Sequence, residues 1–128
     1  DFPEALKWLE RASNLGLARS QYTLGKMYGY GLGIPRDMRT GVHWMRKAAD
    51  QGHKGAQYNL GKIFRDGNDL PTNMVAAVYW FRRAANQGHA RAQSRLSARY
   101  ARGEGVQADN IQAFFWATLA AAQGKSDR

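Results

Sequence analysis

Apolar residues follow a helical spacing along the chain, and residues 74–85 show it most clearly. Apolar side chains there recur at i, i+3, i+4 and i+7 and so share one helix face: Met74, Ala77, Val78, Phe81, Ala84 and Ala85. A second apolar set follows at Ala92, Leu96 and Tyr100. Asn73 is a suitable N-cap for the first of these helices, and Gly88 lies where a left-handed residue would end it. The pattern therefore predicts two helices joined by a short turn.

The same two-helix pattern recurs with a period of 36 residues. One column is Trp8, Trp44, Trp80 and Trp116, and a second is Gly16, Gly52, Gly88 and Gly124. Suitable N-caps recur at Asp37, Asn73 and Asp109, and small residues that would let helices approach closely recur at Gly25, Gly61 and Ser97. We predict full repeats at residues 2–37, 38–73 and 74–109 and a half repeat at 110–128. The expected fold is all-α: a right-handed α-solenoid of antiparallel helix hairpins, with about seven helices in a single domain over residues 1–128.

Composition narrows the functional classes. At 128 residues the chain is long enough for one domain and too short for two independent cores. It has no cysteine, which excludes disulfides, thiolate metal sites and cysteine nucleophiles. It has no apolar run of the roughly eighteen residues that a membrane-spanning helix needs. Because the chain starts at Asp1 without an initiator Met, we expect it to be a processed or excised piece of a longer protein.

The repeat also matches a known family pattern. The string W-x-R-K/R-A-A-x-Q-G-H-x-x-A-Q-x-x-L runs from Trp44 to Leu60 and again from Trp80 to Leu96. It resembles the Sel-one-like repeat (SLR) family, which is related to the tetratricopeptide repeats. The G-x-G loop that completes the family pattern is present at residues 31–37 and 103–109, whereas Asp69 replaces a loop glycine in between.

This resemblance implies a non-enzymatic adaptor that holds other proteins together, in a bacterium, with the periplasm favoured over the cytoplasm. Some bacterial members of the family are similar to immunity proteins, so the alternative is a protein that binds and neutralises a type VI secreted phospholipase toxin. A hydrolase is a third and less favoured alternative. The fold is shared by all these roles and does not choose among them.

Candidate catalytic, metal and cofactor sites have simpler structural interpretations. His53 and His89 occupy the same repeat position, so they lie one repeat apart, which is too far for shared metal ligation. The glycines at positions 29, 31 and 33 follow a predicted helix, whereas a phosphate-binding glycine loop follows a strand. The acidic residues are scattered singly, without a paired-carboxylate site. We therefore predict no enzyme activity, no metal and no cofactor.

Two basic features indicate a binding surface. The chain carries 19 Lys and Arg against 10 Asp and Glu, a net charge of +9. On the predicted first helices of the repeats, basic and aromatic residues form two columns: Lys7, Arg11, His43, Lys47, Tyr79 and Arg83. In tetratricopeptide-like solenoids the first helices line the concave face, so the resemblance implies that these columns would form a groove. Such a groove would bind an acidic peptide or protein surface through Arg and aromatic anchors. The alternative is a solvated face without a partner.

The second feature belongs to the third repeat alone. Arg91, Arg95, Arg99 and Arg102 fall on one face of its second helix, where like charges at i, i+4 repel one another. A stripe that the repeat does not require, and that costs helix stability, indicates an acidic partner, again with solvation as the alternative. Nucleic acid is disfavoured because no recognised binding module accompanies the charge.

The last predicted helix has no hairpin partner. It carries Phe114, Phe115 and Trp116, and terminal repeats normally need a polar cap. Either the chain is truncated there, or this end meets another molecule, a second copy included. Self-association through this helix is therefore one expectation.

Overall fold

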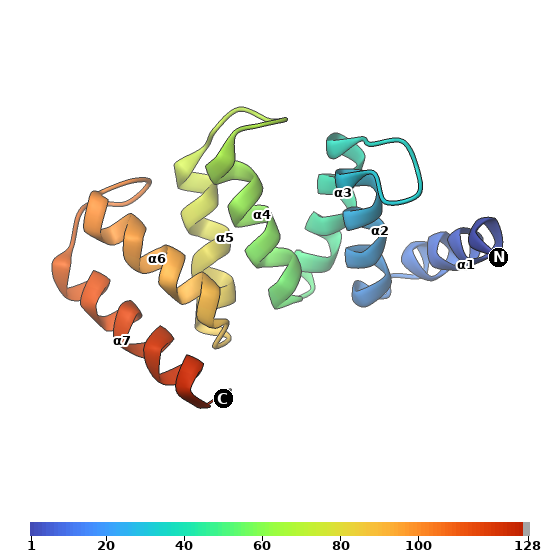
Figure 1. Ribbon diagram of the computed structural model, residues 1–128. Coiled ribbons are helices and arrows are strands. Elements are labelled where there is room, and N and C mark those ends of the chain that lie inside the picture. Colours follow the sequence, from blue (N-terminus) through green and yellow to red (C-terminus); the bar gives the residue numbers. More distant parts are fainter. Residues whose placement is uncertain (127–128) are drawn as a thin grey trace. The chain divides into compact units, whose positions relative to one another are not determined.

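The fold is all-α, as predicted. The computed structural model describes residues 1–126, and every regular element in that range is a helix (Figure 1). The seven helices of this range are α1 (Phe2–Asn14), α2 (Ala18–Tyr30), α3 (Met38–Asp50), α4 (Lys54–Asp66), α5 (Met74–Asn86), α6 (Ala90–Arg102) and α7 (Asn110–Ser126). The last two residues of the predicted half repeat, 127 and 128, lie outside the described residues.

Internal contacts group the chain into two compact units. The first unit is Asp1–Gln57 and the second begins at Tyr58, so the division falls within α4. Within each unit, successive helices pack together: α1 with α2 and α2 with α3 in the first, and α5 with α6 and α6 with α7 in the second. In Figure 1, α2 and α3 run antiparallel, as do α6 and α7. Within the described range, no helix is both long and apolar enough to cross a membrane.

The predicted caps define the helix starts. The side chains of Asp37, Asn73 and Asp109 accept hydrogen bonds from the backbone N–H groups of residues 40, 76 and 112, at 3.2, 3.0 and 3.1 Å. All three caps also hold the preceding loop, because their own N–H groups donate to the carbonyls of residues 28, 64 and 100, at 2.7, 2.8 and 3.0 Å. Each loop is therefore closed by the capping residue itself.

The glycine column is confirmed in three of its four members. Gly88 has a φ of +84°, and the equivalent glycines at positions 16 and 52 have φ values of +91° and +96°. The fourth member differs, because α7 continues through Gly124 to Ser126 and Gly124 has no positive φ. The expectation that glycine ends every first helix is therefore wrong for the last repeat.

Helices in the first unit approach closely at glycine. A Cβ atom on Gly25 of α2 would lie 2.6 Å from Met45 Cγ, and one on Gly41 of α3 would lie 2.7 Å from the Gly25 carbonyl oxygen. Met45 is fully buried at this contact. The small residues predicted to bring paired helices together therefore do so here.

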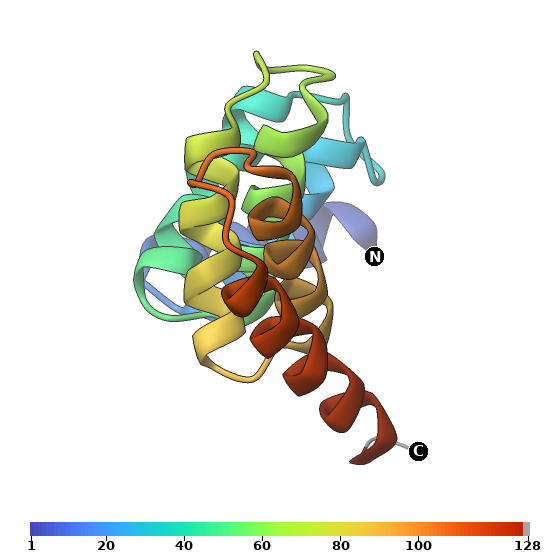
Figure 2. The same ribbon diagram turned by 90° about the vertical axis from the view of Figure 1, so that its left-hand side faces the viewer.

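The core of the second unit is the predicted apolar face. Ala77, Phe81, Ala84 and Leu96 have no exposed surface, and Trp116 of α7 joins their cluster. Figure 2 shows α7 running beside α6, which is the packing that buries Trp116. The tryptophan column is thus part of the core in this unit. Trp8, on the first described helix, is instead 59% exposed.

Candidate interaction surfaces

The first helices carry basic side chains over tryptophan rings. In the first unit, Arg11 Cζ lies 4.9 Å from the Trp8 ring centroid, and Lys47 Nζ lies 5.1 Å from that of Trp44. Each cation is three residues after its tryptophan and therefore lies on the same side of the helix. Both distances are within cation–π range. His43 packs edge-on against Trp44, with 5.4 Å between ring centroids.

The second unit repeats this arrangement on α5. Arg83 Cζ lies 5.4 Å from the Trp80 centroid and 5.7 Å from that of Tyr79. Arg83 Nη1 also donates to the Tyr79 hydroxyl at 3.3 Å, and the Tyr79 ring packs edge-on against Trp80. Tyr79 is 51% exposed, whereas Trp80 is buried. We refer to Trp8–Arg11, Trp44–Lys47 and Trp80–Arg83 as the cation–tryptophan pairs.

The structure thus places the six residues predicted to line a groove as local sets on α1, α3 and α5. Lys7 and Arg11 line a depression of about 240 Å³ with Glu4 and Trp8. His43 and Lys47 share α3, and Tyr79 and Arg83 share α5. The continuous groove along the stack stays a prediction.

The four arginines of α6 differ in how far they are exposed to solvent. Arg91, Arg95 and Arg102 are exposed, but Arg99 is only 4% exposed. Arg99 Nε lies 3.3 Å from Glu104 Oε1, which is an ion-pair distance. Among the described residues, neither of these two atoms makes a hydrogen bond. Burial lowers the pKa of the Arg99 guanidinium from its ordinary value, and the nearby Glu104 carboxylate opposes that shift. Arg99 is therefore a desolvated cation, and only its three neighbours form a surface.

Arg99 opens into a pocket of about 420 Å³ within the second unit, which we call the arginine pocket. Its lining is Arg65, Asp66, Met74, Arg95, Ala98, Arg99, Arg102 and Glu104. Sequence reasoning identified three of these arginines but missed Arg65 and both acids. A signal was present, since Arg99 takes the repeat position held by Ile63 and Met27 in the earlier repeats.

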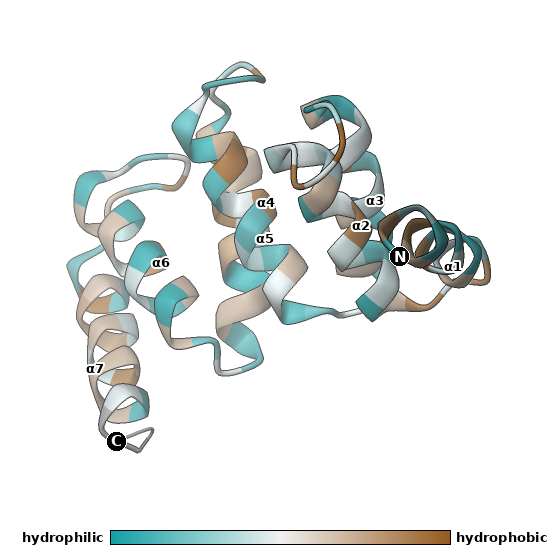
Figure 3. Cartoon of the chain, turned by 45° about the vertical axis from the view of Figure 1, so that its right-hand side comes forward, coloured by the Kyte–Doolittle hydropathy of each residue, from teal (hydrophilic) through white to brown (hydrophobic). Residues whose placement is uncertain are grey.

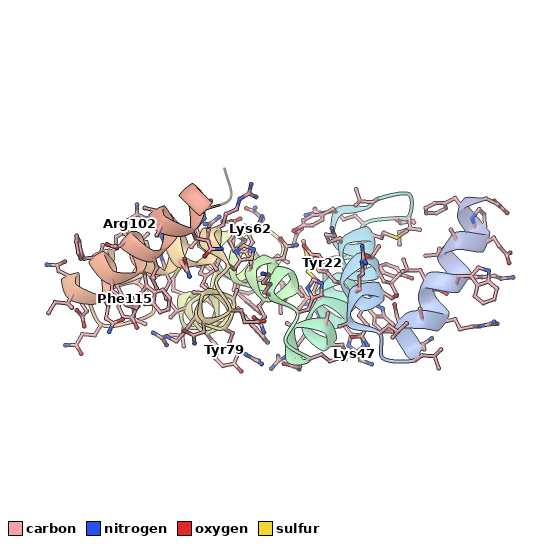
Figure 4. All side chains as sticks on the ribbon, turned by 90° about the horizontal axis from the view of Figure 1, so that it is seen from below. Tyr22, Lys47, Lys62, Tyr79, Arg102 and Phe115 are labelled. Atoms are coloured by element: carbon pink, nitrogen blue, oxygen red, sulfur yellow. The ribbon has the colours of Figure 1, made fainter. Side chains whose placement is uncertain are left out.

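The two kinds of surface lie on opposite sides of the second unit. Figure 4 shows Tyr79 and Phe115, from α5 and α7, on one side, and Lys62 and Arg102, from α4 and α6, on the other. The first helices of the repeats therefore present the cation–aromatic groups, and the second helices present the arginine pocket.

Two of the three histidines, His53 and His89, cap helices. His53 Nδ1 accepts the Ala56 N–H, and His89 Nδ1 accepts the Ala92 N–H, each at 3.1 Å. The predicted structural role at the helix turn agrees with these contacts, although the sequence did not identify the cap itself. Among the described residues, no three His, Cys, Asp or Glu side chains are grouped as a metal site would require.

The sequence belongs to the Sel1 repeat family. The family's sequence profile matches residues 1–17, 18–53, 55–89 and 90–125, which is nearly the whole chain. The resemblance to SLR proteins is thereby confirmed, and with it the all-α solenoid fold. Proteins built from Sel1 repeats are generally protein-interaction scaffolds and are typically non-enzymatic.

Solved structures agree with this assignment. One is c5321, a protective antigen of uropathogenic Escherichia coli with an SLR fold, at 35% identity and a TM-score of 0.88 over 93% of this chain and 26% of that one. A Sel1 repeat protein from Oxalobacter formigenes matches at 32% identity and a TM-score of 0.86, over 94% of this chain and 90% of that one. Helicobacter pylori cysteine-rich protein B, at 16% identity, a TM-score of 0.73 and coverage of 98% and 90%, shares the fold.

The chain thus spans about a quarter of the length of the E. coli antigen. Among the curated proteins, none matches this sequence.

Proposed function

We propose that this chain is a scaffold that binds an acidic segment of a protein partner through its cation–tryptophan pairs. The observation that carries this proposal is the recurrence of the same pair on three successive first helices, with 4.9, 5.1 and 5.4 Å between cation and ring centroid. Packing alone does not require a cation at that position. A guanidinium or ammonium group that lies over a ring is held in place there and presents a positive charge that attracts a carboxylate.

The residues proposed to contact the partner are Lys7, Arg11, His43, Lys47, Tyr79 and Arg83. Arg91, Arg95 and Arg102 form a second basic surface, beside the buried Arg99. Tyr79 adds an exposed aromatic surface beside Arg83, which suits an interface anchor. The net charge of +9 would draw an acidic partner toward the chain and raise its association rate.

Charge reversal tests the proposal. A tagged chain is used to capture proteins from a lysate of the organism that encodes it, in parallel with the K47E/R83E variant. The matched control is R19E/K54E, which changes the net charge equally at two exposed positions outside the pairs. We expect acidic proteins to be captured by the parent and the control, and to bind K47E/R83E on the order of tenfold more weakly and with less salt dependence. Equal capture by all three chains would contradict the proposal.

The alternatives from the sequence have their own tests. An immunity protein would protect bacterial growth against a co-expressed type VI phospholipase, and a hydrolase would turn over ester, amide or β-lactam substrates. Self-association through α7 also stays a prediction. Most of α7 is apolar (Figure 3), and Phe114 on it is 75% exposed. Sedimentation of the parent and of Phe114→Ser over a range of concentrations tests it.

A further inference from the structure

Arg99 is a charged residue at a core position of the repeat. The equivalent residues one and two repeats earlier are Ile63 and Met27, and Ile63 is 8% exposed. Arg99 is buried to the same degree, at 4%. Taking a guanidinium out of water costs free energy unless it is fully paired. The repeat fold is made with an apolar residue here, so this cost needs another explanation.

Among the described residues, the pairing of Arg99 is incomplete. Its Nε is 3.3 Å from Glu104 Oε1 without hydrogen-bond geometry, and its Nη1 faces the Met74 sulfur, a weak acceptor, at 3.9 Å. The same Glu104 oxygen also lies 3.8 Å from Arg102 Nη1, so one carboxylate is shared by two guanidinium groups. A buried guanidinium with five N–H donors therefore has spare donor capacity.

The surrounding pocket is short of negative charge. Four guanidinium groups line it, from Arg65, Arg95, Arg99 and Arg102, against two carboxylates. Asp66 is engaged by Arg65, with 2.9 Å between Oδ1 and Nε. Within the described part of the chain, Arg95 has no acidic partner at ion-pair distance. With about 420 Å³, the pocket has room for a side chain as well as for an ion.

We infer that the arginine pocket binds a carboxylate side chain of an acidic peptide segment, and that Glu104 is an internal carboxylate which the incoming one displaces. The occupant is assigned as a carboxylate because a carboxylate of this chain already lies against Arg99. The inference rests on the proposed function, whose partner is acidic, and identifies a second contact with that partner on the second helices of the repeats.

Displacement would require movement of the Glu104 side chain and not of its loop. A Cβ atom on Gly105 would lie 2.3 Å from the Met74 carbonyl oxygen, so the backbone of the loop is packed tightly against α5. The Glu104 side chain is 38% exposed and can turn into solvent. The Glu104 carboxylate would then compete with the carboxylate of the partner for Arg99. This competition would determine how acidic a segment must be to bind.

Binding of a defined probe tests this. The probe is an acetylated, amidated hexaglutamate peptide, measured by calorimetry against the purified full chain, with hexaglutamine as the matched peptide control. We expect R99I, which installs the residue of the preceding repeat, to weaken hexaglutamate binding about tenfold or more, because it removes charge-assisted hydrogen bonds. E104Q should tighten binding several-fold by removing the competitor. R19Q, which removes an exposed charge on α2 outside both proposed surfaces, should have less than about a threefold effect.

Three outcomes would overturn the inference. One is R99I binding hexaglutamate as tightly as the parent, and another is E104Q binding no more tightly than the parent. The third is inorganic phosphate binding with the same dependence on Arg99 at lower concentration than the peptide, which would make the site a phosphate site. Circular dichroism and thermal unfolding check that R99I is folded. The exposed double variant R95Q/R102Q is the second test, with the same expected loss.

The two proposals fail separately. The effect of R99I on hexaglutamate binding is measured again in the K47E/R83E background, whose changes lie outside the pocket. If that effect persists while K47E/R83E still captures the partner, the pocket stands and the cation–tryptophan proposal fails. If K47E/R83E loses the partner but R99I does not change peptide binding, the pocket inference fails alone.

Discussion

At the residue scale, His53 has a helix-capping role that its residue type alone does not predict. The neutral imidazole accepts the Ala56 N–H through Nδ1 and packs on the Tyr22 ring, with 4.6 Å between centroids. Burial lowers the pKa of His53 below its ordinary value of 6.5 against an opposing backbone hydrogen bond, and the nearby Lys26 and Arg19 charges lower it further. Only the unprotonated nitrogen can serve as this cap.

The cap therefore makes stability depend on pH. Because the pKa of His53 is lower in the folded state, the unfolded chain binds more protons as the pH falls below about 6.5. The contribution of His53 is fully present above that pH and is lost as the pH falls through the folded pKa. Urea unfolding from pH 8 to pH 5 should show a smaller decline for H53N than for the parent, since Asn caps well and does not titrate. Equal declines would contradict this account.

Gly88 is required for its backbone conformation alone. Its φ is +84°, and a Cβ atom there would meet nothing within 4 Å. Gly88→Val should lower the free energy of unfolding by about 1–3 kcal/mol through backbone strain, measured by urea denaturation. Gly124→Ala is the matched control, because that glycine also has free space but lies inside α7. It should be neutral or stabilising by up to about 1 kcal/mol. Similar losses in both variants would refute the conformational argument.

At the element scale, the glutamine column joins the two helices of each hairpin. The side-chain amides of Gln21, Gln57 and Gln93 donate to carbonyls near the end of the preceding helix, those of residues 13, 49 and 85, at 3.1, 3.0 and 3.2 Å. These are carbonyls that a helix end leaves without an intrahelical partner. The period identified the column, but its purpose became visible only with the hairpin geometry.

Gln93→Leu tests this link. The Ala85 carbonyl would still accept the Gly88 N–H at 3.0 Å, so the loss is one hydrogen bond and not a wholly unpaired group. We expect a decrease of about 0.5–1.5 kcal/mol in the free energy of unfolding. Ser94→Ala, an exposed change on the same helix, should stay within about 0.5 kcal/mol. A Gln93→Leu variant as stable as the parent would show that the column contributes packing only.

At the scale of the whole molecule, the 36-residue period predicted the helices, their caps and the core face, because these are requirements that every repeat shares. It predicted the site less well. Arg91, Arg95, Arg99 and Arg102 share one helix face in sequence, but burial separates Arg99 from the rest. That burial depends on Met74 and Glu104, which lie 25 residues before and five after it, and spacing within a single helix does not report such contacts.

Comparing the third repeat with the second predicts that the residues of the proposed arginine pocket lower the stability of the fold. In the second repeat, the positions of Arg99 and Glu104 are held by Ile63 and Asn68. Transferring them as R99I/E104N replaces a poorly hydrogen-bonded ion pair, whose arginine is buried and whose Glu104 side chain is 38% exposed, by two residues that the repeat already accommodates. Such replacements are commonly neutral or stabilising, so thermal and urea unfolding should show a change between zero and a gain of about 2 kcal/mol. The exposed swap R95N should stay within about 0.5 kcal/mol. A loss of more than about 1 kcal/mol in R99I/E104N would mean that the pair stabilises the hairpin, and Arg99 would then need no ligand to explain it.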